Sequence, residues 1–261
     1  MVSRALVFAV AGVLGLAGAA GAASSLRLEE PPGFGEVESA TLDLEGIPLG
    51  PSRVALTRDA AGRVALHSES AIAGGDSVRL EALLEPAGPG GALRLLEQRS
   101  VAVDRNGVLL LDMAIDHVTR RATCTTPDAR GTLELPQADR VANVPINLLL
   151  LPLARGDLAR LEFQALVCRG GDPRLLDVSA RRTGRVVLGP HGGAAVEIEY
   201  EVKLGALLAR IAGPFLPRML FWIDPAATPD PLVAHRMPLY PRGPTVLVVR
   251  RELPPDLFLT R

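Results

Sequence analysis

The feature that most constrains the fold of this chain is a strict two-residue alternation of apolar and charged side chains. It is clearest in the segment 196–203, where Val196, Ile198, Tyr200 and Val202 alternate with charged residues. Successive side chains of a β-strand point to opposite faces, so the alternation predicts a strand with one buried and one wetted face. Such strands are typical of antiparallel sheets, because parallel sheets are covered on both faces.

The same alternation, in weaker form, predicts strands along most of the chain. Two further examples lie at 78–84 and 161–167. The remaining predicted strands cover 37–45, 52–58, 63–69, 92–103, 107–115, 117–124, 131–135, 174–182, 184–189, 218–223, 231–238 and 244–251. Turn residues separate many of them, as at 104–107 and 170–173. We therefore expect a mainly β fold, an antiparallel curved sheet forming a half-barrel or barrel, with one or two packed helices.

Two segments interrupt the strand pattern. Residues 137–156 contain an uninterrupted leucine run and are predicted to form a short helix or a loop that crosses between two halves of the sheet. Residues 204–213 place leucines at helical spacing and predict one helix, ended by Gly213-Pro214. We expect this helix to pack on the sheet. The alternatives are a lid over a ligand cavity and a membrane-surface element. The absence of a polybasic face favours packing.

The start of the chain resembles a targeting segment. Arg4 precedes an apolar stretch that begins at Ala5 and passes into small residues ending at Ala23. A basic start, an apolar middle and a small-residue end predict a secretory signal peptide over 1–22, cleaved after Ala22. The protein is then periplasmic or secreted. The alternative is an uncleaved anchor, which is the only membrane association that we expect.

We expect one domain after the signal peptide. Residues 23–35 are predicted to be a flexible leader, 36–254 a single β-rich domain, and 255–261 a C-terminal tail. Sandwiches and barrels reach this length as single domains. Two halves joined at 137–157 are the alternative organisation.

Cysteine content fits the predicted export. Cys124 and Cys168 are the two cysteines of the chain. An even number in an oxidising compartment predicts one disulfide, and the alternative is two separate buried thiols. Without a CxxC pair, neither a zinc site nor a redox enzyme is indicated.

Composition disfavours several classes of partner. The net charge is −1, which supplies no basic excess for phosphates, so nucleic-acid binding is not expected. Aromatic residues make up 3%, too few for the stacking platforms of sugar or single-strand binding. The four histidines form no metal spacing, and no cofactor motif is present, so we expect neither a metal nor a cofactor.

No catalytic residues are predicted. The cluster His67–Ser70 combines a hydroxyl, an imidazole and a carboxylate, but neighbours on a strand point apart and cannot form a relay. On a strand, Asp112 and Asp116 would share one face and His117 the other, which is poor geometry for a metal. A GxSxG nucleophile elbow is absent.

The segment 232–240 is the best candidate for ligand binding. It places His235, Arg236 and Tyr240 among apolar residues, and one of the first two must face the interior if the segment is a strand. The segment is either an edge strand with no binding role, or a strand that places a polar group inside an apolar cavity to bind the head group of a ligand. Trp222 is a further candidate, although its apolar neighbours favour a core position.

One part of the chain resembles a known family. A strand leads to the turn Gly46-Ile47-Pro48-Leu49-Gly50, followed by Val54-Ala55-Leu56 and a strand that ends in Ser68-Glu69-Ser70. Over about residues 37–70 this is similar to exported bacterial proteins grouped as a domain of unknown function, which look related in architecture to the half-barrel lipoprotein carriers of the cell envelope. The resemblance implies a curved antiparallel sheet with an apolar concave face, and no catalytic residues.

Three functions stay open. The first is a non-enzymatic periplasmic protein that binds a lipid or another apolar envelope component in the concavity of the sheet. The second is a structural or assembly protein of the cell envelope that acts through protein–protein contacts. The third is a secreted hydrolase using His235 or the segment 112–117, which the lack of a catalytic motif disfavours.

Overall fold

The computed structural model describes residues 26, 28–72, 74–88, 91–189, 193–203, 218–240 and 243–259. The predicted signal peptide and the predicted helix 204–213 lie outside these residues. Among the described residues, no helix combines the length and the hydropathy needed to cross a bilayer.

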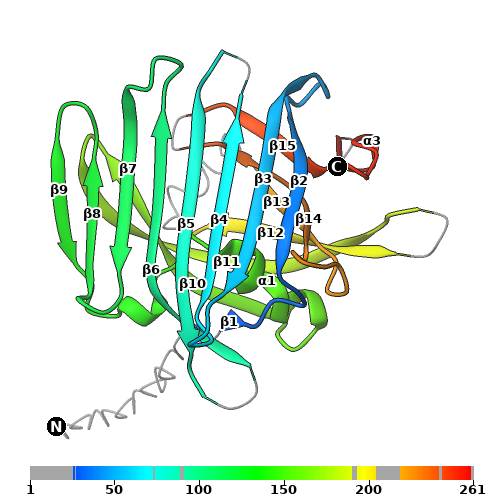
Figure 1. Ribbon diagram of the computed structural model, residues 1–261, viewed down its shortest axis with the longest axis horizontal. Helices are drawn as coiled ribbons and strands as arrows, with labels where there is room; N and C mark the ends of the chain where they lie inside the picture. The colour runs from blue at the N-terminus through cyan, green and yellow to red at the C-terminus, as the bar shows by residue number, and fades with distance from the viewer. Residues whose placement is uncertain are drawn as a thin grey trace, which may run out of the picture.

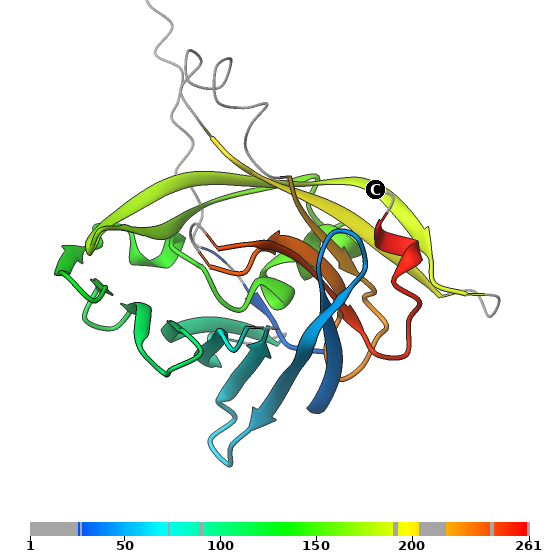
Figure 2. The same ribbon diagram turned by 90° about the horizontal axis from the view of Figure 1, so that it is seen from above.

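The described chain forms one antiparallel sheet that curls into an unclosed barrel (Figures 1 and 2). Its strands are β1 (Leu28–Glu29), β2 (Gly35–Leu42), β3 (Pro48–Arg58), β4 (Val64–Ala71), β5 (Ser77–Pro86), β6 (Ala92–Val103), β7 (Leu109–Asp116), β8 (Arg121–Thr125), β9 (Arg130–Glu134), β10 (Arg160–Arg169), β11 (Asp172–Val187), β12 (Ala194–Val202), β13 (Met219–Ile223), β14 (Leu232–Pro238) and β15 (Thr245–Arg250). The predicted fold class is confirmed.

The strand order is that of a meander with one break. It runs β10-β11-β12-β13-β14-β15-β2-β3-β4-β5-β6-β7-β8-β9, and β1 pairs with β6. Every neighbouring pair is antiparallel. Along the main path, the break lies where β15 pairs with β2 and Leu247 lies opposite Leu42. The edges of the sheet, β10 and β9, come from the middle of the chain.

Local side-chain chemistry explains where strands differ from the predicted ranges. β8 begins at Arg121 rather than 117, because Asp116 Oδ1 accepts hydrogen bonds from the backbone N–H groups of Val118 and Thr119 and holds a turn there. The predicted strands 174–182 and 184–189 are one strand, β11, in which the register shifts between Arg182 and Gly184.

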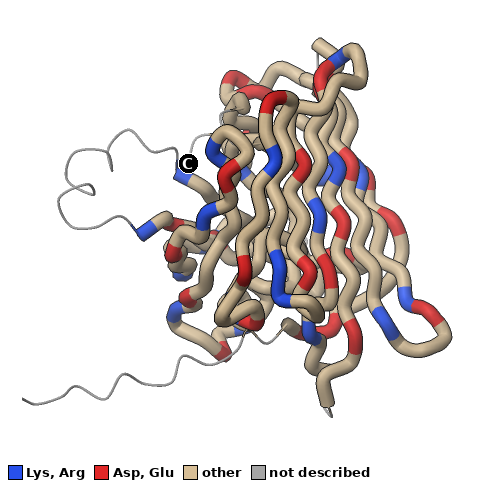
Figure 3. Tube along the Cα trace, turned by 90° about the vertical axis from the view of Figure 1, so that its left-hand side faces the viewer, with Lys and Arg blue, Asp and Glu red and all other residues tan. Residues whose placement is uncertain are grey.

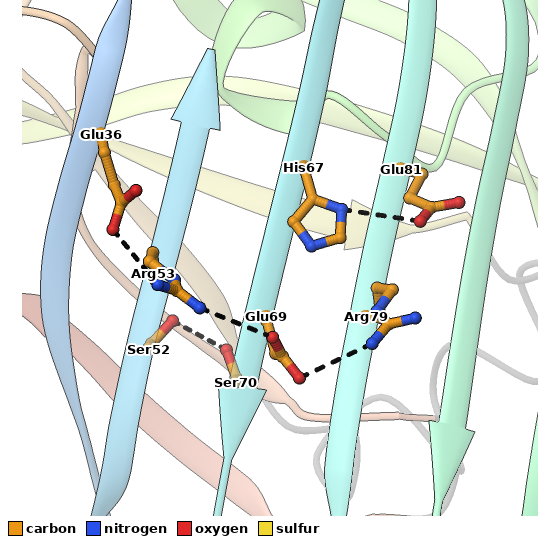
Figure 4. A network of polar contacts seen from close by, with 8 residues as sticks. All are labelled: Glu36, Ser52, Arg53, His67, Glu69, Ser70, Arg79 and Glu81. Atoms are coloured by element: carbon orange, nitrogen blue, oxygen red, sulfur yellow. Dashed lines mark hydrogen bonds and ion pairs between the residues drawn. The ribbon is translucent and has the colours of Figure 1, made fainter.

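Basic and acidic residues are interspersed along the neighbouring strands of the sheet (Figure 3). Arg53 pairs with Glu36 and Glu69 across three strands, and Glu69 also pairs with Arg79 (Figure 4). These groups are roughly half exposed, so each pair contributes at most about 1 kcal/mol. Their main effect is to keep the outer face of the sheet in water and the opposite face inside the barrel.

Helix α1 (Ile146–Arg155) lies inside the curve of the sheet (Figure 2). Every residue from Asn147 to Ala154 is buried. Leu148 belongs to an apolar cluster with residues of β3–β6, β10 and β11, whereas Leu150 belongs to one with residues of β11–β13. The segment 137–156 is therefore a helix that fills the barrel, preceded by the short 3-10 helix η1 (Ala138–Arg140).

A disulfide, a close glycine contact and backbone pairing all contribute to holding the open seam between β9 and β10. The predicted disulfide joins Cys124 of β8 to Cys168 of β10, with their Cα atoms 5.7 Å apart. Gly131 lies against the turn after β10, where a Cβ would come within 2.4 Å of the carbonyl oxygen of Gly171, so only glycine fits. An isolated bridge also pairs Val141 with Gln164.

The predicted leader and tail both contain ordered elements. Leu28–Glu29 of the leader pairs with β6, and Leu28 is buried in the core. The predicted tail includes helix α3 (Asp256–Leu259), whose Phe258 is fully buried against Trp222. Apolar residues in both segments explain why they pack on the sheet.

Candidate ligand-binding cavity

A cavity of about 360 Å³ lies inside the barrel. Its walls come from the inner faces of β2–β7 and β10–β15. The first turn of α1 also lines it, through Ile146 and Asn147. Most of the lining is aliphatic, with residues such as Val54, Leu80 and Met113. A hollow of this kind accommodates part of an aliphatic molecule.

Aromatic rings form a continuous row across one wall. The ring of Phe163 meets Tyr200 edge-on at 5.5 Å, Tyr200 lies 6.0 Å from Phe221, and Phe221 stacks on His235 at 6.1 Å. These residues belong to β10, β12, β13 and β14, and the last three line the cavity. Burial raises the pKa of Tyr200 far above its usual value, so its hydroxyl stays protonated.

His235 is a neutral polar group on this wall. Its side chain retains some accessible surface because it borders the cavity, but it lies deep within the barrel. Burial lowers its pKa from 6.5 to about 4. The ring is therefore uncharged at neutral pH and offers one donor and one acceptor nitrogen.

Serine side chains form a second polar area on the inner face of β2, β3, β4 and β6. Ser39, Ser52 and Ser70 lie opposite one another in register, and the hydroxyls of Ser52 and Ser70 are 2.8 Å apart (Figure 4). Ser68 and Ser100 flank Leu80 in the neighbouring row. All five line the cavity, and we call them the serine wall.

Asp230 is a buried carboxyl in the loop before β14 that lines the cavity. Asn147 Nδ2 donates a hydrogen bond to Asp230 Oδ1 at 2.8 Å, and the Leu232 N–H donates to the same oxygen at 3.0 Å. Desolvation is the largest influence on Asp230 and raises its pKa. Arg250 donates to the backbone oxygens of Asp230 and Leu232, which places a guanidinium beside this carboxyl.

The β14–β15 connection crosses toward the turn between β4 and β5. Tyr240 donates its hydroxyl to Asp76 Oδ2 at 3.1 Å, although 164 residues separate the two in sequence. Leu239 and Tyr240 both line the cavity. This hydrogen bond ties two turns together at one end of the cavity.

The structure brings two of the four predicted ligand-binding residues together. His235 and Tyr240 line the cavity, whereas Arg236 and Trp222 do not. Arg236 follows His235 on the same strand and therefore points to the other face. Trp222 is fully buried on that other face, where it packs on Phe258 and donates its indole N–H to Glu197.

Asp112, His117 and His67, which the sequence also singles out, do not line the cavity. Arg99 holds Asp112 in a two-point ion pair on the outer face. His117 instead contacts Gln98 and the carbonyl oxygen of Ala138 beside the seam. His67 faces outward, 3.5 Å from Glu81, and no group of three or more metal-ligating side chains occurs among the described residues. His191 lies outside the described residues.

Sequence reasoning missed the serine wall and Asp230. The alternation indicates that these serines point inward, because Ser68 and Ser70 lie on the same face of their strand as Leu66. The sequence carries no comparable signal for Asp230, because its buried partners Asn147 and Arg250 are distant from it in sequence.

A second, wider hollow of about 1920 Å³ lies on the other side of α1, which contributes Leu149 and Pro152 to it. It borders Glu29 and Arg155, which form an ion pair. Its lining includes several arginine, aspartate and glutamate residues, unlike that of the cavity, and none of the four predicted ligand-binding residues.

Comparisons with known proteins identify no family. No family model and no curated protein matches the chain. Among solved structures, the chain is similar to the crystal structure of a β-barrel-like protein of a domain of unknown function, DUF1849, from Brucella abortus. The two share 8% sequence identity with a TM-score of 0.48, over 85% of this chain and 96% of that one.

Proposed function

We propose that this protein binds one small apolar molecule with a lipid-like aliphatic portion inside its barrel. The observation that carries the proposal is the cavity of about 360 Å³ with mostly aliphatic walls. Ligand sites typically measure about 300–1,000 Å³ and combine apolar walls with a few polar groups. The size favours a single chain over a whole phospholipid.

The proposed location is the periplasm or the exterior of the cell. The disulfide between Cys124 and Cys168 supports an oxidising compartment, where such bonds persist. The basic and apolar start of the sequence supports export. The partner is then a lipid or another apolar component of the cell envelope.

The polar groups of the cavity support binding rather than catalysis. Within the described residues, the hydroxyl of Ser52 bonds to that of Ser70, and no serine of the wall is hydrogen-bonded to His235. A nucleophilic serine needs a base within hydrogen-bonding reach. The arrangement fits the anchoring of a ligand by isolated polar contacts.

Native mass spectrometry of the full chain, expressed with its own N-terminal segment, tests the proposal. We expect extra mass that disappears on denaturation and that lipid analysis identifies as an aliphatic molecule. A Leu80→Trp variant fills the cavity from β5 and should lose this mass. Leu83→Trp makes the same change on the same strand toward the opposite face and should retain it.

Two results would contradict the proposal. One is a bare chain that also fails to bind the neutral fluorophore N-phenylnaphthylamine. The other is binding that survives in Leu80→Trp while circular dichroism shows the variant to be folded.

A further inference from the structure

The described cavity lining contains no lysine or arginine. Asp230 is its single carboxyl group, and His235 is neutral because burial lowers its pKa. A carboxylate or phosphate drawn into this space would find no free cation in the described lining to replace its hydration. The nearest guanidinium, that of Arg250, already donates to the backbone oxygens of Asp230 and Leu232.

A cationic ligand meets the opposite difficulty. Asp230 is the single carboxyl group of the described lining, and it lies beside the guanidinium of Arg250. Its carboxyl oxygen Oδ1 is already occupied by donors from Asn147 and Leu232. The local charges of Asp230 and Arg250 therefore offset each other, and an ammonium gains little there.

Uncharged hydrogen-bonding capacity, in contrast, is plentiful. In the described part of the chain, the hydroxyls of Ser39, Ser68 and Ser100 have no protein partner, and each of these residues lines the cavity. Asn147 is 3% exposed, and its Oδ1 atom has no hydrogen-bond partner there. Hydroxyls both donate and accept, whereas Asn147 Oδ1 needs a donor.

We propose that the cavity selects an uncharged amphiphile: an aliphatic chain that ends in a hydroxyl-bearing head, such as a fatty alcohol or a monoacylglycerol. The serine wall and Asn147 bind the hydroxyls, while Tyr200 and Phe221 contact the chain. Fatty acids and phospholipids are discriminated against because their heads carry a charge. This inference rests on the proposed function and specifies its ligand.

Isothermal titration calorimetry with three ligands of equal chain length tests the inference. Dodecanol, dodecanoate and dodecylammonium are titrated at neutral pH into the full chain, below their aggregation concentrations. We expect dodecanol to bind at least about tenfold more tightly than either ion, since burying an unpaired charge is costly. Dodecanoate binding as tightly as dodecanol would overturn the inference, and so would dodecylammonium doing so.

A set of variants tests the role of the hydroxyls. The triple variant Ser39→Ala, Ser68→Ala and Ser100→Ala should weaken dodecanol binding at least about fivefold, while N-phenylnaphthylamine binds unchanged. Thr57→Ala removes a hydroxyl from the outer face of β3 and should change neither. Unchanged dodecanol affinity in a folded triple variant would overturn the inference.

The same experiment separates the two proposals. If N-phenylnaphthylamine and all three dodecyl ligands fail to bind, the proposed function itself fails. If the fluorophore binds but the charged ligands match dodecanol, the cavity binds apolar molecules without the selectivity inferred here.

Discussion

At the scale of single residues, Gln98 has the most connected side chain near the seam. Its Oε1 atom accepts hydrogen bonds from the backbone N–H groups of Asn143 and Val144, at 2.6 and 2.9 Å. Its Nε2 atom donates to His117 Nε2 and to the carbonyl oxygen of Val141. Gln98 therefore fixes the segment that leads from η1 to α1.

Replacing Gln98 with alanine should destabilise the protein by about 3 kcal/mol. The variant leaves two backbone donors without an acceptor, and each such group costs about 1–3 kcal/mol when buried. Urea unfolding followed by circular dichroism measures the change. Thr57→Ala on the outer face serves as control, and equal stability of the two variants would refute this role of Gln98.

His235 should make the protein less stable in acid. Its folded-state pKa of about 4 lies below the ordinary value of 6.5, so the folded state favours the neutral ring. As the pH falls below 6.5, the unfolded chain binds a proton that the folded chain does not, and stability decreases until about pH 4. The loss amounts to at most about 3 kcal/mol.

Unfolding free energies at about pH 7 and about pH 4.5 check this prediction. His235→Phe should show a smaller loss of stability in acid than the unmodified protein. His67→Phe makes the same substitution on the outer surface and provides the matched control. An equal acid dependence in His235→Phe and the unmodified protein would show that another group is responsible.

At the scale of elements, α1 owes its place to being apolar on all sides. A surface helix has one apolar face, whereas every residue of α1 from Asn147 to Ala154 is buried between the two halves of the sheet. Its end is set by Gly156, whose φ of 94° is the left-handed conformation that glycine adopts readily. The helix thus belongs to the core that both halves of the sheet share.

Replacing Leu150 with alanine should cost about 2–5 kcal/mol, because this fully buried side chain packs against β11–β13. Leu158→Ala, shortly after the same helix at a residue that is 39% exposed, should cost less than about 1 kcal/mol. Guanidinium unfolding of the two variants gives the comparison. Similar costs would mean that α1 packs loosely inside the barrel.

Elements were predictable from the sequence to different degrees. The alternation at 196–203 predicts β12 because one face of the sheet is wet. The leucine run of α1 has no such period, so the sequence alone does not distinguish a helix from a loop in this segment. His235 and Tyr240 could be predicted because they are polar residues in an otherwise apolar segment. The serine wall could not, because it depends on which strands pair, and the sequence alone does not give the strand pairing.

At the scale of the whole molecule, the disulfide is the covalent closure of an otherwise unclosed sheet. It joins β8 to β10 across the seam and closes a loop with a sequence separation of 44. Removing it increases the conformational entropy of the unfolded chain, because this loop is no longer closed. The chain-entropy model assigns such a bond about 3–4 kcal/mol.

The double variant Cys124→Ala and Cys168→Ala should therefore have a lower melting temperature than the oxidised protein. A reducing agent should lower the melting temperature of the unmodified protein toward that of the variant and leave the variant unchanged. Equal melting temperatures for the variant and the oxidised protein would show that the other seam contacts suffice.

The placement of β15 beside β2 also governs the order in which the molecule is assembled during synthesis. Strands β2 to β9 have neighbours that follow them directly, so this half of the sheet can pair as the chain emerges. The free side of β2 has to wait for β15, the last strand of the described chain to be made. Until then β2 is an open edge that another chain can pair with. We therefore expect the incomplete chain to be more prone to aggregation before β15 pairs with β2 than after it.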